Sequence, residues 1–193
     1  MTATTFLARS FAALALAAIS AGASGKTIEY AIQPETGIES WQLVAEGFDV
    51  MFMQINPDQA RGFFLGRGFK REDADLYAES CVLAAIVKNH TKDLIAYNLA
   101  DWRYTDGKGA VKHKLRLRGD WLEIWKQRGV SKSSRIAFEW SQHPDKQLLE
   151  PGDWNQGMTT YQVPHGSTLA LIVNWKTGEH IREETIPGIR CAK

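Results

Sequence analysis

Cysteine is scarce in this sequence, and the short motifs that identify many enzyme active sites are missing. Cys81 and Cys191 are the only cysteines among 193 residues, and they form no C-x-x-C motif. The sequence also contains no G-x-S-x-G nucleophile turn, no H-E-x-x-H zinc motif and no glycine-rich phosphate loop. These absences favour a protein that binds over one that catalyses a reaction, and we expect no enzyme.

Long apolar runs are lacking too, with one short exception near the start. Arg9 is the single charge before an apolar run at residues 11–20, and small residues that include Ala21 and Ala23 follow it. This order predicts a secretory signal peptide over residues 1–25 and export, most simply to the bacterial periplasm. No later run approaches the roughly 18 apolar residues of a membrane helix. We therefore expect no transmembrane segment in the mature chain.

Excess charge of either sign is absent as well. The chain carries 23 Lys and Arg against 22 Asp and Glu, and removal of the leader with Arg9 makes the two numbers equal. A strongly basic nucleic-acid-binding protein is disfavoured on this ground. The apolar share of 44% and the charged share of 23% are ordinary for a globular protein, and we expect residues 26–193 to form one domain.

The two cysteines predict a disulfide bond, because the leader directs the chain to an oxidising compartment. A bond between Cys81 and Cys191 would stabilise the fold by about 4–5 kcal/mol on the chain-entropy model. A pair of free or metal-bound thiols is the alternative.

Short stretches that alternate between apolar and polar residues dominate the chain, with turn residues between them. We expect about eight strands, since turns recur at the spacing typical of β-sandwiches. The clearest strands are predicted at residues 48–55, 82–87, 95–102, 112–118, 135–141 and 158–163 and in the last 26 residues. The fold class is therefore mainly β with inserted α, an antiparallel, immunoglobulin-like β-sandwich.

One or two helices are predicted between early strands. Asn56, Pro57 and Gln59 form a capping-box start, and the helix should end at Gly66 or Gly68. A second helix is expected over residues 71–80. One or two further helical turns are expected at residues 119–129, after the cap residue Asp120.

A long loop predicted at residues 143–157 contains the leading candidate for a recognition site. Trp154 offers a flat apolar surface, and the polar residues beside it could orient a partner or ligand. The candidate set is Asp153, Trp154, Asn155, Gln156, His143 and His165. The alternative is structural: Asp153 and Asn155 would bond their own backbone, and Trp154 would close one end of the sandwich.

Methionine and histidine raise the possibility of copper binding. Met51 and Met53 would point to the same face of a strand, and thioether plus imidazole is a ligand set that copper accepts. The histidines are His90, His113, His143, His165 and His180. Paired methionines more often fill a core, and these histidines are scattered singly. We therefore assign no metal ligand and no cofactor.

Four basic residues alternate along the strand predicted at residues 112–118: Lys112, Lys114, Arg116 and Arg118. Together they could bind an anionic partner such as lipid headgroups, a polysaccharide or an acidic protein. The alternative is that like charges on one face protect an exposed strand edge against aggregation.

The sequence thus predicts an exported, disulfide-tied binding or accessory protein that recognises a protein partner in the cell envelope or a ligand. A periplasmic copper-handling protein is one alternative, and a cell-envelope hydrolase is another. The hydrolase would take its acid from Asp101, Asp120 or Asp153. Two carboxylates that face each other across a cleft at about 5–10 Å would favour it.

Overall fold

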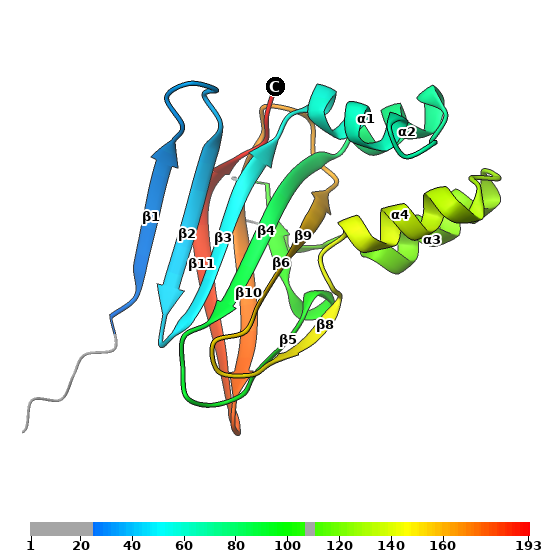
Figure 1. The fold of residues 1–193 in the computed structure, drawn as a ribbon. Coiled ribbons are helices and arrows are strands. Elements are labelled where there is room, and N and C mark those ends of the chain that lie inside the picture. Colours follow the sequence, from blue (N-terminus) through cyan, green and yellow to red (C-terminus); the bar gives the residue numbers. More distant parts are fainter. Residues whose placement is uncertain (1–24, 107–110) are drawn as a thin grey trace, which may run out of the picture.

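The computed structural model describes residues 25–106 and 111–193, which form two antiparallel sheets and four α-helices (Figure 1). In chain order the elements are β1 (Thr27–Ile32), β2 (Glu39–Ala45), β3 (Phe48–Ile55), α1 (Pro57–Leu65), α2 (Arg71–Ala78), β4 (Cys81–Asn89), β5 (Ile95–Asn98), the 3-10 turn η1 (Leu99–Asp101), β6 (Arg103–Thr105), β7 (His113–Lys114), α3 (Arg118–Gln127), α4 (Lys132–Ser141), β8 (Lys146–Leu149), β9 (Trp154–Tyr161), β10 (Thr168–Thr177) and β11 (His180–Arg190).

The first sheet has the strand order β1-β2-β3-β4-β9. The second sheet has the order β7-β6-β10-β5-β8, and β11 lies along β10. The named strands of both sheets pair in the antiparallel sense. In Figure 1 the first sheet lies in front of the second. The predicted mainly antiparallel β structure with inserted helices is confirmed.

One apolar core fills the space between the two sheets. Alternate residues of β2 and β10 point into it, and Leu43 and Val173 are fully buried there. The ring of Phe48 in β3 stacks on Trp175 in β10, with 4.4 Å between the ring centroids. Large side chains from both sheets therefore meet in a single core.

The predicted disulfide bond between Cys81 and Cys191 is confirmed. Cys81 is the first residue of β4 and Cys191 follows β11, and their Cα atoms are 5.3 Å apart across a sequence separation of 110 residues. The bond joins an interior strand of the first sheet to the end of the second sheet.

The four helices pack together beside β4 and β9 of the first sheet (Figure 1) and share a second core. Its rings include Phe64, Tyr77, Trp121 and Phe138, which are all fully buried. Val82, on the outer face of β4, belongs to the same cluster. This outer row explains why β4 is apolar on both faces.

The start of α1 follows its sequence signal. The Asn56 side chain accepts a hydrogen bond from the Gln59 N–H at 2.8 Å, and the Gln59 side chain accepts one from the Asn56 N–H at 3.0 Å. Pro57 occupies the first helical turn. The capping box places α1 directly after β3, as predicted.

The strand predicted at residues 135–141 is wrong, because this segment belongs to the helix α4. Ser131 caps that helix through a hydrogen bond from the Ser134 N–H at 3.1 Å. Of the three apolar residues that suggested a strand face, only Phe138 is buried, whereas Ile136 is 46% and Trp140 is 86% exposed. Ser134 and Phe138 lie four residues apart and form the buried stripe of a helix.

Two other boundaries also differ from the sequence prediction. Only His113–Lys114 of the strand expected at residues 112–118 is a strand, because α3 begins at Arg118. The long loop expected at residues 143–157 contains β8 and the first residues of β9.

The expected signal peptide at residues 1–25 falls almost wholly outside the described residues. None of the helices in the described part of the chain is long and apolar enough to cross a membrane.

Candidate functional site

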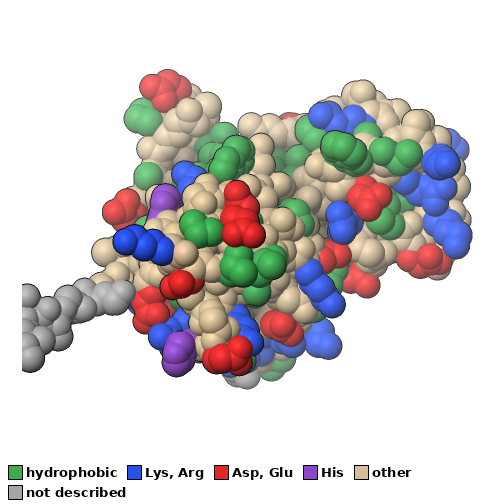
Figure 2. Space-filling view, turned by 60° about the horizontal axis from the view of Figure 1, so that its bottom comes forward, with side chains coloured by type: hydrophobic (Ala, Val, Ile, Leu, Met, Phe, Trp, Pro, Cys, Tyr) green, Lys and Arg blue, Asp and Glu red, His purple; other side chains and the backbone are tan. Residues whose placement is uncertain are grey.

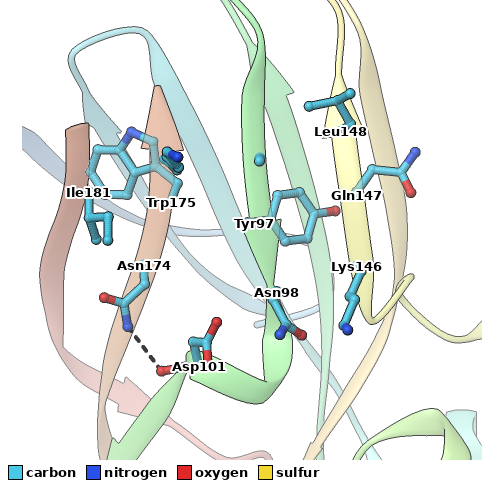
Figure 3. Close-up of a pocket in the computed structure, with 11 residues that line it drawn as sticks. Tyr97, Asn98, Asp101, Lys146, Gln147, Leu148, Asn174, Trp175 and Ile181 are labelled. Carbon is cyan, nitrogen blue, oxygen red and sulfur yellow. Dashed lines mark hydrogen bonds between the residues drawn. The ribbon is translucent and has the colours of Figure 1, made fainter. Parts of the chain in front are cut away.

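A concavity of about 690 Å³ lies on the outer face of the second sheet and crosses four of its strands (Figure 3). The strand register places one row of side chains across it, because Leu148 pairs with Ala96, Ala96 with Lys176, and Lys176 with Ile181. The lining residues are Ala96, Tyr97, Asn98, Asp101, Lys146, Gln147, Leu148, Asn174, Trp175, Lys176 and Ile181.

Side-chain size explains why the sheet is hollow at this point. Ala96 has a small side chain in the middle of the row, whereas Leu148 and Ile181 stand at its two ends and are 56% and 74% exposed. Large aliphatic side chains this exposed on a sheet face lose unfavourable hydration when a ligand covers them. The row therefore provides two apolar walls with a gap between them.

Polar side chains are held in place beside this row. The Asn174 side chain donates a hydrogen bond to the Asp101 carbonyl oxygen at 3.0 Å (Figure 3). The Asn98 side chain accepts one from the Ala100 N–H at 3.1 Å. Both carboxamides are thus fixed by the turn η1. They can offer directed hydrogen bonds to a ligand without a large loss of side-chain entropy.

The charged lining groups are two ammonium groups and one carboxylate. Lys146 comes from β8 and Lys176 from β10, and Asp101 lies at the end of η1. The exposed carboxylate of Glu179 lies 3.5 Å from the ammonium nitrogen of Lys176. Among the lining residues two ammonium groups stand against one carboxylate, a balance that suits a ligand with an anionic group, although Glu179 offsets part of it.

The candidate recognition loop is divided between the surface and the core. Trp154 and Gln156 are exposed residues of β9, on the outer face of the first sheet. Asn155 points the other way, and the Tyr97 hydroxyl donates a hydrogen bond to its Oδ1 atom at 2.8 Å. Asp153 accepts a hydrogen bond from the Glu150 N–H at 3.0 Å, which is the local role that the structural alternative describes.

The two candidate histidines lie at different places. His165 is in the exposed turn after β9, at the end of the strand opposite to Trp154. An eight-residue strand is about 25 Å long, so His165 lies far from Trp154. His143 is 1% exposed, and its ring centroid lies 5.7 Å from that of Tyr97.

His143 is a buried, neutral base. Its Nδ1 atom is 3.3 Å from the Pro144 carbonyl oxygen, which can only accept, so Nδ1 carries the proton. Its Nε2 atom is buried and has no hydrogen-bond partner among the described residues. Burial lowers the pKa of His143 to about 4, and the bond to Pro144 partly opposes this shift.

A second, smaller hollow of about 300 Å³ contains Gln156 together with Trp140. Its other lining residues are Arg118, Glu139, Gln142 and Pro144. Trp140 is 86% exposed at the end of α4, and sequence reasoning missed it because a strand was expected there. The start signal at Ser131 to Ser134 could have identified the helix.

The four basic residues do not form one strand face. Their alternation ends at Leu117, where the chain turns into α3. The Arg116 guanidinium lies 4.9 Å from the Trp121 ring centroid, whereas Arg118 approaches Glu139 and Asp145 at 3.9 Å. Lys112 and Lys114 are exposed. On the face shown in Figure 2, Lys and Arg side chains gather over the helical part at the right.

The copper ligands suggested by the sequence are spread over several surfaces. Met51 and Met53 share the outer face of the first sheet, as predicted. His90 contacts the Asp49 carboxylate at 3.2 Å near that face, and the His113 ring lies 5.2 Å from the Tyr104 ring. Within residues 25–106 and 111–193, no group of three or more His, Cys, Asp or Glu side chains could hold a metal ion.

The three candidate catalytic acids lie on different elements. Asp101 lines the concavity, whereas Asp120 caps α3 by accepting the Leu117 N–H at 2.9 Å, and Asp153 lies in the turn before β9. Asp101 is the only carboxylate among the lining residues of the concavity. Its lining therefore does not supply the opposed pair of acids on which the hydrolase hypothesis depends.

Sequence reasoning did not identify the concavity. Its residues come from β5, η1, β8, β10 and β11, and the meeting of these strands depends on their register. Two weak signals of the concavity were present in the sequence. Ala96 is a small outward residue in the otherwise bulky strand β5, and Ile181 is an apolar residue on the polar face of β11.

Comparison with known proteins gives no functional assignment: the chain matches no protein-family model, and no curated protein matches it significantly.

Proposed function

We propose that this chain is an exported binding or accessory protein of the cell envelope, most simply of the periplasm, that acts by recognition and not by catalysis. Its ligand is an apolar group with an adjacent negative charge, and it binds in the concavity on the second sheet. The observation that carries this proposal is the row Leu148, Ala96, Lys176 and Ile181. It combines two exposed apolar walls, a gap and an ammonium group.

Two features support export. The first 25 residues have the composition of a secretory leader. Cys81 and Cys191 form a disulfide bond, and such bonds persist in oxidising compartments.

The proposed scaffold is an immunoglobulin-like sandwich, and the two facing antiparallel sheets support this assignment. The strand order gives less support. In the first sheet β1, β2, β3 and β4 follow one another as a meander, whereas immunoglobulin domains have Greek-key connections.

Sodium octanoate tests the proposed ligand chemistry, because it joins an aliphatic chain to one carboxylate. We expect it to shift the backbone amide NMR signals of β5, β8 and β10 in a saturable manner. Octylammonium, which has the same chain and the opposite charge, should bind at least about tenfold more weakly, a difference of about 1.4 kcal/mol. Equal binding of the two ions would contradict the proposed role of Lys146 and Lys176.

Substitutions locate the site. Ala96→Phe fills the gap in the row and should weaken octanoate binding at least about tenfold. Ile136→Ser is the matched control, because Ile136 is an exposed apolar residue of α4 outside the concavity. Ile136→Ser should bind octanoate as the wild type does. The proposal fails if octanoate causes no shifts, or if Ala96→Phe binds octanoate as tightly as the wild type and this control do.

A further inference from the structure

β1 is an edge strand that exposes an unusual amount of apolar surface. All six of its residues, Thr27–Ile32, are exposed, and in the described part of the chain the strand pairs only with β2. Ile28, Tyr30 and Ile32 are 38%, 47% and 52% exposed. They alternate along the strand and therefore share one face.

This face continues the core-facing side of the first sheet. Ile28 pairs with Leu43 and Tyr30 pairs with Trp41, and both partners are buried between the sheets. Directly paired residues point to the same side of a sheet. The inner row of apolar side chains thus extends beyond the covered core to an open edge, which is visible at the left of Figure 1.

Polar contacts with β11 hold this edge in place. Arg190 of β11 forms an ion pair with Glu39 of β2 at 2.6 Å and donates a hydrogen bond to the Tyr30 hydroxyl at 2.6 Å. Lys26, just before β1, forms an ion pair with Glu184 of β11. The strand is therefore anchored to both sheets, and no segment among residues 25–106 and 111–193 pairs with its outer edge.

One backbone hydrogen bond next to β1 shows which way its N–H and C=O groups point. The Gln33 N–H donates to the Ile38 carbonyl oxygen at 2.8 Å, so Gln33 directs its backbone groups towards the β2 side. In an antiparallel pair, hydrogen-bonded and free positions alternate. Ile28, Tyr30 and Ile32 consequently direct their N–H and C=O groups to the open edge. The same residues carry the apolar side chains.

β1 also lacks the features that protect edge strands. It contains no proline, its pairing with β2 has no bulge, and Glu29 is its single charged residue. Glu29 pairs with Gln42, a position on the outer face. A chain that presents free hydrogen-bonding groups and apolar side chains together matches another strand with the same pattern.

We propose that β1 pairs with β1 of a second copy of this chain, in the antiparallel sense, about a two-fold axis at Tyr30. This register sets Tyr30 opposite the partner's Tyr30 and Ile28 opposite the partner's Ile32. Glu29 then lies opposite the partner's Ala31. All free N–H and C=O groups of the three even-numbered residues become paired, and the two first sheets join into one continuous sheet.

The neighbouring registers are less favourable for pairing. A two-fold axis at Glu29 sets that carboxylate directly opposite the partner's Glu29, and like charges there are destabilising. An axis at Ala31 sets Ile28 opposite the partner's Pro34, which has no N–H to donate. An axis between two residues pairs the apolar face of one copy with the polar face of the other.

The first experiment measures association of the full exported chain by sedimentation velocity over a wide concentration range. One pair of six-residue strands buries less than the roughly 1,600 Å² of a standard interface, so we expect a weak dimer that dissociates on dilution. Ile32→Lys and Tyr30→Pro should raise the dissociation constant at least about tenfold, since each removes an edge contact. Tyr30→Pro leaves the bonds to β2 intact, because the Tyr30 N–H points away from β2.

Thr27→Lys is the matched control, because it adds the same charge to the outer face of the same strand. It should dimerise as the wild type does. Far-UV circular dichroism should show the same fold in all variants. A chain that stays monomeric at all concentrations overturns the proposal, and so does a dimer that Ile32→Lys and Tyr30→Pro leave unchanged. Monomers with exchange-protected amides at Ile28, Tyr30 and Ile32 would show that another segment covers the edge, which also overturns it.

A cross-linking experiment tests the register. The two native cysteines are already bonded to each other, so an introduced cysteine provides a single free thiol. Opposed residues in a hydrogen-bonded pair have Cα atoms about 5.5 Å apart, within the range of a disulfide bond. Tyr30→Cys should form a covalent dimer under mild oxidation, whereas Glu29→Cys should not. The reverse result would exclude the axis at Tyr30.

Discussion

The Tyr97 hydroxyl donates a hydrogen bond to the Oδ1 atom of Asn155 at 2.8 Å and so links the two sheets through their shared core. Tyr97 belongs to β5 of the second sheet and Asn155 to β9 of the first. Burial raises the pKa of Tyr97 above its ordinary value, although the bond to Asn155 opposes the shift, and the phenol remains a donor. A partly buried acceptor thus has its partner on the opposite sheet.

Tyr97→Phe should lower the free energy of unfolding by about 1–3 kcal/mol, because it leaves the partly buried Asn155 oxygen without its donor. Asn155→Leu should also destabilise, because it leaves the Tyr97 hydroxyl without an acceptor. The double variant should lose less than the sum of the two single losses, since both polar partners are then gone. Urea unfolding of the four proteins measures this coupling, and strictly additive losses would show that the bond contributes nothing.

Removal of the disulfide bond by Cys81→Ala with Cys191→Ala should reduce the free energy of unfolding by about 4–5 kcal/mol on the chain-entropy model. The bond spans 110 residues, so its main effect is to restrict the unfolded chain. Wild type treated with a reductant should match the double variant in urea unfolding. A loss below about 1 kcal/mol would contradict this origin of the stability.

The parts of the fold that were predictable depend on local signals. The helix α1 was predicted because Asn56, Pro57 and Gln59 carry its start in four consecutive residues. The disulfide was predictable because two cysteines allow only one pairing. The helix α4 was missed because Ile136, Phe138 and Trp140 fit an alternation of two over only seven residues. Packing of Phe138 against the other helices decides between helix and strand there.

The candidate site was less predictable than the fold, because it depends on which strands are neighbours. Ala96 and Ile181 meet through Lys176 of β10, and nothing local to any of these residues specifies that register. The predicted recognition loop failed for a local reason, the alternation of side chains along a strand. It treated Trp154 and Asn155 as one surface, but consecutive residues of a strand face opposite sides, and Asn155 points towards the core.

His143 should make the protein less stable as the pH falls. The folded state lowers the pKa of this imidazole from 6.5 to about 4, so between these values the unfolded chain binds a proton that the folded protein does not. The contribution of His143 to the free energy of unfolding is therefore fully present above about pH 6.5. It is lost as the pH falls towards 4, which lowers the free energy of unfolding by roughly 3 kcal/mol. Unfolding in urea at several pH values measures the slope, and NMR titration of the ring should show its midpoint near the lower value.

His143→Leu isolates this contribution, because it keeps an apolar side chain in the buried position and removes the titrating group. Burial raises the pKa of the neighbouring Asp145, and the charge of Arg118 partly opposes this rise. A raised carboxyl pKa increases the free energy of unfolding as the pH falls, which is opposite to the effect of His143. Asp145 is present in both proteins, so its effect cancels in their difference. A wild type and a His143→Leu variant with the same pH dependence would contradict the assignment.

Gly157 of β9 lies close against residues 142–143, which directly follow α4. A Cβ atom at Gly157 would lie 2.2 Å from the His143 nitrogen and 2.4 Å from the Gln142 carbonyl carbon, and these backbone atoms cannot turn away as a side chain can. The His143 N–H donates to the Met158 carbonyl oxygen at 3.0 Å, which fixes this approach. Gly157→Ala should therefore cost roughly 3 kcal/mol or more.

Gly62→Ala is the matched control for Gly157→Ala. Gly62 lies inside α1, and a Cβ atom there would meet nothing within 4 Å. The substitution should stabilise the protein by up to about 1 kcal/mol, because alanine favours the helix over glycine. Urea unfolding should move the midpoints of the two variants in opposite directions. A Gly157→Ala midpoint equal to that of wild type would mean that the contact between β9 and residues 142–143 is looser than these distances require.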